Sequence, residues 1–276
     1  MKRRFADVDV FSNKPYFGNP VAVVLDSDGL DDEQMQRIAA WTNLSETTFV
    51  LAPTDTDADY RVRIFTPTQE LRFAGHPTLG TCHAWLAAGG LPRDGTFIRQ
   101  ECGAGLVRLR RIDGRLAFAG PPLFRTGPVD ETLVAHIASV LRIGRDEITD
   151  AEWADNGPGW VAVRLATAED VLALDPGFVD IDLAVVGAYP SGLAATLEVR
   201  AFFPNGSTTV EDPVTGSLGA SLAPWLIRTG VVTSPFVISQ GGAVGREGRV
   251  HVSVDDDGTA WVAGDTISCI EGEIEI

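Results

Sequence analysis

The chain has 276 residues, of which 45% are hydrophobic and 22% charged, and this composition predicts a globular protein large enough for two domains. Acidic residues number 38 against 22 Lys and Arg, so the formal net charge is −16 at pH 7. Because such a surface repels phosphate groups, we expect neither nucleic acid nor an anionic membrane as a partner. No run of 18 apolar residues predicts a membrane span, and the N-terminus lacks the apolar stretch of a secretory signal.

The cysteines and the motif inventory exclude several kinds of site. Cys82, Cys102 and Cys269 are odd in number and lack CxxC spacing, which predicts free thiols in a reducing cytoplasm instead of disulfides or zinc. The chain also contains no GxGxxG or Walker loop, no GxSxG elbow and no HExxH pair. Nicotinamide, ATP and zinc chemistry are therefore not expected.

The periodicity of apolar residues predicts two sets of similar elements along the chain. The first set comprises an apolar strand at 21–25, a helix from about Asp32 to Trp41 capped by Asp31 or Asp32, an alternating strand at 60–65 and an apolar helix beginning at Pro77. The second comprises a surface helix at 130–141, an apolar strand at 161–165, an alternating strand at 197–202 and an apolar helix beginning at Pro213. Helices that are apolar nearly all round belong inside a core, so we expect a sheet around each of the two apolar helices.

An internal repeat joins these two sets. Segments 21–23, 63–67, 76–80 and 85–90 recur in the same order at 161–163, 200–204, 212–216 and 225–230. The offsets of 136 to 140 residues exceed a solenoid period and predict a two-lobed molecule. We predict an α+β fold of two pseudo-symmetric lobes, each a curved, barrel-like β-sheet around a central helix. The N-terminal lobe would span 1–120, with the C-terminal strand 265–276 returning to it, and the C-terminal lobe would span 121–264.

Each apolar helix is preceded by a titratable residue. In GHP at 75–77 and EDP at 211–213 the proline falls where the first helical residue is expected, which makes His76 and Asp212 the predicted N-caps. The free amides of a helix start attract a carboxylate or another anion. Asp212 could equally be a plain helix cap, but its equivalence to His76 in the repeat favours a paired functional site. We therefore expect both residues to face one cleft that binds a small anionic molecule.

Glu46 is a further candidate because it is the one charged residue in the segment TNLSETTFVLAP, which reads as a loop entering a strand. Partial burial there would raise the pKa of the carboxyl group and suit it to remove and return a proton. The alternative is an exposed glutamate at a strand edge, which the residues alone do not exclude.

Five segments carry a family resemblance. They are DVFSNKPYFGNPVAVV near the start, NLSETTFV at 43–50, RIFTPTQELRFAGHPTLGT at 63–81, VEDPVTGSLGASLA at 210–223 and SQGGAVGREGRV at 239–250. Together they resemble the PhzF-like phenazine-biosynthesis family, which shares its fold with diaminopimelate epimerase, over nearly the whole chain. The resemblance implies two lobes with mixed sheets, a ligand between the lobes, and a homodimer.

The resemblance also implies a chemistry. In the characterised phenazine enzyme, the glutamate that matches Glu46 moves a proton during isomerisation of dihydro-3-hydroxyanthranilate without a cofactor. Residues that match His76, Asp212 and Ser217 line that site. The epimerase relatives place a cysteine at each helix start, where this chain has His76 and Asp212, so a racemase that uses two thiols is not expected.

We predict a cofactor-independent, cytoplasmic isomerase that shifts a proton on a small carboxylate-bearing substrate, with Glu46, His76 and Asp212 as catalytic residues. Two alternatives stay open: a C–C hydrolase or lyase on the same fold, which would change the mass of the product, and a non-catalytic binding protein. The predicted substrate-binding residues are Asn19, Ser45, Gly75, Thr78, Gly216, Ser217, Gln240 and Gly241.

Overall fold

The computed structural model describes residues 1–157 and 159–276, and the chain divides into two compact units. Unit 1 comprises Met1–Ala119 together with Ala263–Ile276, and unit 2 comprises Gly120–Val262. Within the described residues, no helix is both long enough and apolar enough to cross a membrane.

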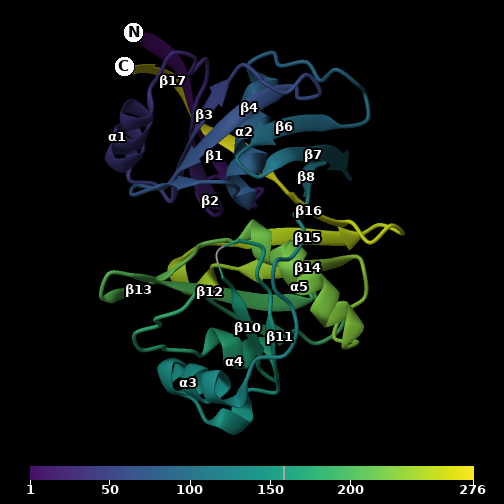
Figure 1. The fold of residues 1–276 in the computed structure, drawn as a ribbon. Helices are drawn as coiled ribbons and strands as arrows, with labels where there is room; N and C mark the ends of the chain where they lie inside the picture. The colour runs from purple at the N-terminus through teal and green to yellow at the C-terminus, as the bar shows by residue number, and fades with distance from the viewer. Residues whose placement is uncertain (158) are drawn as a thin grey trace. The chain divides into compact units, whose positions relative to one another are not determined.

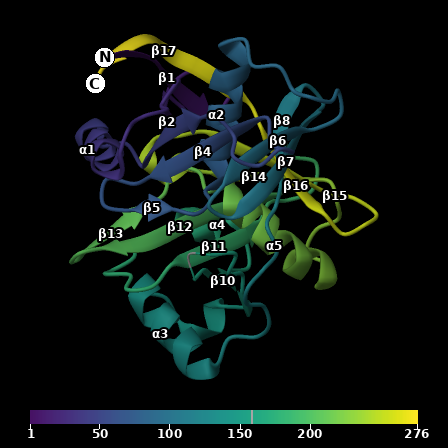
Figure 2. The same ribbon diagram turned by 45° about the horizontal axis from the view of Figure 1, so that its top comes forward.

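Unit 1 contains a mixed sheet in which both ends of the chain take part. The first strand lies between the last strand and β2, so the two termini are neighbours (Figures 1 and 2). Beyond that edge, β2 is parallel to β3, β3 is antiparallel to β4, and β4 pairs antiparallel with β5 and parallel with β6. The strands of unit 1 are β1 (Lys2–Val10), β2 (Asn19–Val24), β3 (Glu46–Leu51), β4 (Tyr60–Phe65), β5 (Glu70–Leu71), β6 (Ile98–Cys102), β7 (Gly105–Ile112), β8 (Arg115–Ala119) and β17 (Thr266–Glu275).

The two helices of unit 1 have different surroundings. Helix α1 (Asp32–Thr42) begins with a capping box, in which Asp31 and Gln34 each accept from the other's backbone N–H. Helix α2 (Gly75–Ala87) is mostly buried and packs against β1, β2, β3, β8 and β17 (Figure 2). A Cβ at Gly80 would lie 2.3 Å from a Val21 methyl carbon, so only glycine allows α2 to approach β2 this closely.

Unit 2 repeats this arrangement with its own elements. Its strands are β9 (Asp150–Trp153), β10 (Val161–Arg164), β11 (Leu183–Ala188), β12 (Leu197–Asn205), β13 (Thr208–Glu211), β14 (Phe236–Gln240) and β15 (Gly248–Val254), and β16 (Ala260–Gly264) leads back into unit 1. Its helices are α3 (Glu131–Leu141), α4 (Ala168–Leu172) and the central α5 (Gly216–Arg228), with short 3-10 turns at Arg145–Glu147 and Gly242–Val244.

The pairing pattern of unit 2 reproduces that of unit 1 strand by strand. Strand β10 is parallel to β11, β11 is antiparallel to β12, and β12 pairs antiparallel with β13 and parallel with β14. In each unit the central helix follows the short fourth strand of this series, β5 or β13. The duplicated unit and the α+β class predicted from the sequence are therefore confirmed, with a mixed sheet in each unit.

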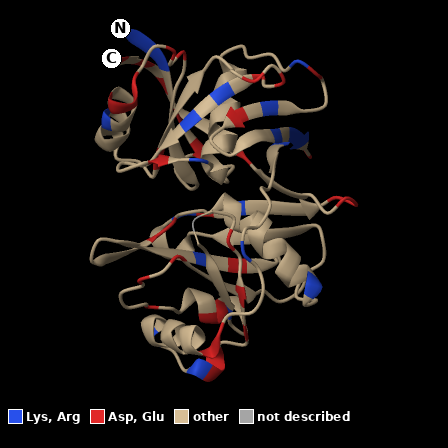
Figure 3. Ribbon diagram, viewed as in Figure 1, with Lys and Arg blue, Asp and Glu red and all other residues tan. Residues whose placement is uncertain are grey.

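The acidic residues occur along strands, loops and helices of both units, with arginines among them (Figure 3). Within the part of the chain that the structure describes, no three His, Cys, Asp or Glu side chains are grouped closely enough to hold a metal ion. The charge of the chain is thus distributed and not concentrated in a cation site.

Candidate functional site

The start of β2 brings Glu46 and His76 together. Glu46 is the first residue of β3 and pairs with Val21 in the parallel β2–β3 ladder. His76 lies in the first turn of α2, and its ring hydrogen-bonds to the backbone of Pro20, the residue before Val21. Two elements that are 30 residues apart in sequence therefore deliver a carboxyl group and an imidazole to the same strand end.

Burial holds the His76 imidazole in its neutral form. Its side chain is 6% exposed, and this desolvation lowers the pKa of His76 from 6.5 to about 3. Proline has no N–H, so the bond between the ring and Pro20 runs from a ring N–H to the Pro20 carbonyl, which favours the charged form and opposes the effect of burial. The imidazole is therefore neutral across the physiological pH range.

The second ring nitrogen of His76 faces the carboxyl group of Glu46. Nε2 lies 3.1 Å from Glu46 Oε2, and the Glu46 side chain is 14% exposed. The two atoms are within proton-transfer distance but are not aligned for a straight hydrogen bond. If the other ring nitrogen donates to Pro20, the neutral ring presents a lone pair to Glu46, and a proton can be held by either partner. The pair can therefore accept and return a proton in a site with little water.

Helix α2 begins before its proline, Pro77, and helix α5 begins after its proline, Pro213, whereas the sequence predicted that both helices begin at the proline. The N-cap of α2 is Ala74 and that of α5 is Thr215, so the prediction that His76 and Asp212 are N-caps is wrong. His76 is the second residue of α2, and Asp212 lies three residues before the cap of α5. The N–H groups of the first three helical residues need no intrahelical partner, so proline is tolerated at the third position of α2 as well as at the first.

Neither central helix is capped by a side chain at its N-terminus. Helices α1, α3 and α4 each have a capping hydrogen bond, from Asp31, Asp130 and Thr167 respectively. The N-terminal amides of α2 and α5 lack this bond. The helix starts that the sequence singles out are therefore the ones whose N-cap side chain makes no capping hydrogen bond, which favours anion binding there.

In unit 2, a hydrogen-bond network fixes the segment that precedes α5. The Thr215 hydroxyl donates to Asp212 Oδ2, and Gln240 accepts from the Thr215 backbone N–H at 2.9 Å and donates to the Asp212 carbonyl at 3.1 Å. Gly241 has φ +93°, and a Cβ there would lie 2.4 Å from the Pro213 carbonyl oxygen. Gln240 and Gly241, both predicted to bind substrate, thus hold the Asp212 loop in place.

The remaining predicted residues differ in accessibility. Asn19 is fully buried at the start of β2, and Thr78 is fully buried, where it donates to the Ala74 carbonyl and accepts from Gln100. Ser45 is exposed beside Glu46. Gly75 and Gly216 are the buried first residues of α2 and α5, and Ser217 is partly exposed in the first turn of α5.

The sequence did not identify Asn156, a further polar residue beside the start of α5. Asn156 is 6% exposed, and its Nδ2 donates to the Ser217 carbonyl at 3.0 Å. The two residues are 61 positions apart, and Asn156 sits in a loop that looks like an ordinary turn. No local pattern in the sequence could have paired them.

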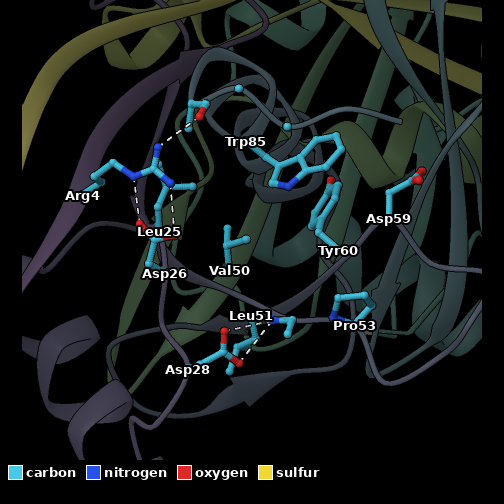
Figure 4. Close-up of a pocket in the computed structure, with 14 residues that line it drawn as sticks. Arg4, Leu25, Asp26, Asp28, Val50, Leu51, Pro53, Asp59, Tyr60 and Trp85 are labelled. Carbon is cyan, nitrogen blue, oxygen red and sulfur yellow. Dashed lines mark hydrogen bonds and ion pairs between the residues drawn. The ribbon is translucent and has the colours of Figure 1, made fainter. Parts of the chain in front are cut away.

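A pocket of about 320 Å³ lies in unit 1 at the opposite end of α2 from His76. None of the predicted site residues lines it. Figure 4 shows Trp85 over Tyr60 on one side and the Arg4 guanidinium paired with Asp26 on the other. Arg4 also donates to the Ala88 carbonyl, and Asp28 accepts from the Ala52 backbone, so the polar groups shown there serve the fold.

Comparison with known proteins identifies the family. A family model described as phenazine biosynthesis-like protein (PhzC-PhzF) matches residues 8–272. The chain belongs to this family. A crystal structure of a PhzF-family phenazine biosynthesis protein from Bacillus anthracis superposes with a TM-score of 0.83 at 24% identity, covering 100% of both chains, which shows the shared fold.

Two curated relatives span almost the whole chain. Antisense-enhancing sequence 1 of Schizosaccharomyces pombe is 39% identical over 292 residues, covering 98% of this chain and 97% of the relative. The trans-2,3-dihydro-3-hydroxyanthranilate isomerase of Pseudomonas aeruginosa is 34% identical over 274 residues, covering 97% and 94%. The family prediction is confirmed, and the chain is a PhzF-type isomerase.

Proposed function

We propose that this isomerase shifts a proton within a small, unsaturated substrate that bears a carboxylate, and that Glu46 moves the proton. The substrate named for the Pseudomonas aeruginosa relative, a dihydro-3-hydroxyanthranilate, belongs to this chemical class. The observation that carries the proposal is the buried Glu46–His76 contact of 3.1 Å. A carboxyl group and a neutral imidazole at this distance form an acid–base pair that can take a proton from carbon and return it.

The surroundings of this pair support a proton shift over rival chemistries. Thr81 on α2 donates to Thr48 on β3 at 2.8 Å, which ties the two elements that carry His76 and Glu46. A rigid, nearly dry pair limits loss of the abstracted proton to solvent, as an intramolecular transfer requires. A hydrolase would instead need a water molecule activated beside the reacting bond.

The substrate carboxylate is proposed to bind amides at a helix start, either around Gly75 to Thr78 or around Asp212 to Ser217. These helix starts have no side-chain cap, and the positive end of each helix dipole favours an anion. Asp212 is proposed to protonate or stabilise the delocalised intermediate, and Ser217 to orient a polar group of the substrate. No cofactor is needed for these steps.

The test is the change Glu46→Gln, which keeps the shape of the side chain and removes its ability to carry a proton. We expect turnover of trans-2,3-dihydro-3-hydroxyanthranilate to fall by about 10²–10⁴-fold, because a positioned acid–base group contributes about that much. NMR in deuterium oxide would follow isomerisation and exchange at carbon. Glu33→Gln, on the exposed face of α1, is the matched control and should leave turnover unchanged. Turnover above a tenth of wild type in the Glu46 variant would contradict the proposal.

We extend the proposal to assembly and location. The family resemblance supports a homodimer, and the three free cysteines, Cys82, Cys102 and Cys269, support a reducing, cytoplasmic environment. Light scattering of the purified protein should give a mass of about 59 kDa, twice the 29.5 kDa of one chain. A mass of 29.5 kDa at micromolar concentration would contradict the dimer.

A further inference from the structure

The side-chain amide of Asn156 makes a hydrogen bond through its nitrogen but not through its oxygen. Nδ2 donates to the Ser217 carbonyl, and because a carbonyl can only accept, this bond fixes which end of the amide is nitrogen. The other end, Oδ1, is buried and accepts no hydrogen bond from the described residues. A buried amide oxygen without a donor is destabilising, and most such atoms in folded proteins have a partner.

The Nδ2 bond places the Asn156 amide group beside the first turn of α5. Ser217 is the second residue of that helix, and the helix has no side-chain cap. The same turn therefore offers two complementary features: amides that suit a carboxylate, and an acceptor that suits an N–H or O–H group. A molecule that satisfies both must carry a hydrogen-bond donor close to its carboxylate.

We propose that Asn156 is a specificity-determining residue, and that its Oδ1 accepts a hydrogen bond from an amino group adjacent to the substrate carboxylate. This inference rests on the proposed function, because it assumes a carboxylate at the start of α5. The hydrogen bond to Asn156 would select ortho-amino carboxylates over the same carboxylates without the amino group. A site built around a buried acceptor rejects the ligand that lacks the donor, since the acceptor then stays unpaired.

A purely structural role would look different in one respect. If Asn156 only holds Ser217 in place, its removal lowers the affinity for every ligand of the α5 start by the same factor. If Asn156 binds the amino group, its removal abolishes the difference in affinity between two ligands that differ only by that amino group. The ratio of two affinities therefore separates the two roles, whatever happens to stability.

The experiment measures binding of 2-aminobenzoate and benzoate by isothermal titration calorimetry. Wild type should bind 2-aminobenzoate about five- to tenfold more tightly, the ratio expected for one net hydrogen bond. In Asn156→Ala and in Asn156→Leu, which preserves side-chain volume, the two ligands should bind within twofold of each other. Asn205→Ala, in the exposed β12–β13 turn, is the control and should retain the wild-type ratio.

Three outcomes would overturn the inference. These are a preference for the amine that survives in both Asn156 variants, equal binding of the two ligands by wild type, and no binding of either ligand by wild type. The same titrations on Glu46→Gln separate this inference from the proposed function. A retained, Asn156-dependent preference in a protein that never exchanges carbon-bound hydrogen would leave the inference standing and remove the proton-shift proposal.

Discussion

The two units share a topology but differ in chemistry at matching positions. In the parallel ladders, Glu46 pairs with Val21 in unit 1, and the matching pair in unit 2 is Leu183 with Val161. The unit 2 position is a fully buried leucine, so the duplicated frame holds a carboxyl group in one copy only. The comparison shows that the strands and the central helix make the scaffold, while a single side chain at the start of the third or eleventh strand decides which unit carries a carboxyl group at that position.

A second comparison concerns an arginine that occurs at matching positions of the repeat in the two units. Arg63 and Arg200 each make a two-point contact with a glutamate on the next strand, Glu70 and Glu211 respectively. The unit 1 side chains are 22% and 42% exposed, whereas those of unit 2 are 7% and 10% exposed. Arg200 also donates to the Leu174 carbonyl. The same pair is therefore partly exposed to solvent in unit 1 and nearly buried in unit 2.

The largest effect that we expect comes from breaking this pair in each unit. Glu211→Ala leaves the Arg200 guanidinium buried without its counter-charge and should destabilise the protein by about 3–5 kcal/mol. Glu70→Ala leaves a partly solvated Arg63 that still contacts Asp32, and should cost about 1 kcal/mol or less. Urea unfolding of both variants would measure the difference. Equal losses would show that burial does not distinguish the two pairs.

The next effect concerns how closely each central helix approaches its sheet. A Cβ at Gly80 of α2 would lie 2.3 Å from Val21, whereas one at Gly219 of α5 would lie 3.1 Å from two valine methyl carbons. Gly80→Ala should destabilise the protein by about 1–3 kcal/mol, because α2 must move away from β2. Gly219→Ala should stay within about 1 kcal/mol of wild type, since the higher helix propensity of alanine offsets a small local shift.

Enzyme assays would also test whether the close approach of α2 to β2 matters for catalysis. Displacing α2 also moves His76 away from Pro20 and Glu46, so Gly80→Ala should lower turnover even where the protein remains folded. A Gly80→Ala protein with wild-type stability and turnover would mean that the close approach of α2 to β2 is not required.

Much of the fold could be predicted because it depends on repeated patterns. The matching segments at 63–67 and 200–204 located β4 and β12, and apolar composition located both central helices. The exact helix starts could not be predicted from proline alone. Pro77 occupies the third position of α2, while Pro213 lies before the cap of α5, and both are allowed because neither position needs a backbone N–H for the helix.

The site was predictable in part for the same reason. Glu46 and His76 could be named from residue type and context, but their contact depends on the register of β2 with β3, which no local pattern records. Asn156 could not be named at all, because its significance comes from a hydrogen bond to a residue 61 positions away. Residue types are thus visible in the sequence, whereas long-range registers require the structure.

The smallest effect that we expect distinguishes the residues just before β11 and β3. Asp182 precedes β11, where unit 1 has Ser45 before β3, and burial together with the charge of Asp155 raises the pKa of Asp182 from 3.8 to about 6. The folded state therefore favours the protonated carboxyl group, and its contribution to stability is complete below pH 3.8 and is lost as the pH rises through 6. Asp182→Asn should remove this loss, so that the stability difference between variant and wild type grows by about 1 kcal/mol from pH 4 to pH 7, after allowance for solvent screening. Urea unfolding at pH 4, 5, 6 and 7 would measure it, and parallel curves for the two proteins would show that Asp182 titrates alike in the folded and unfolded states.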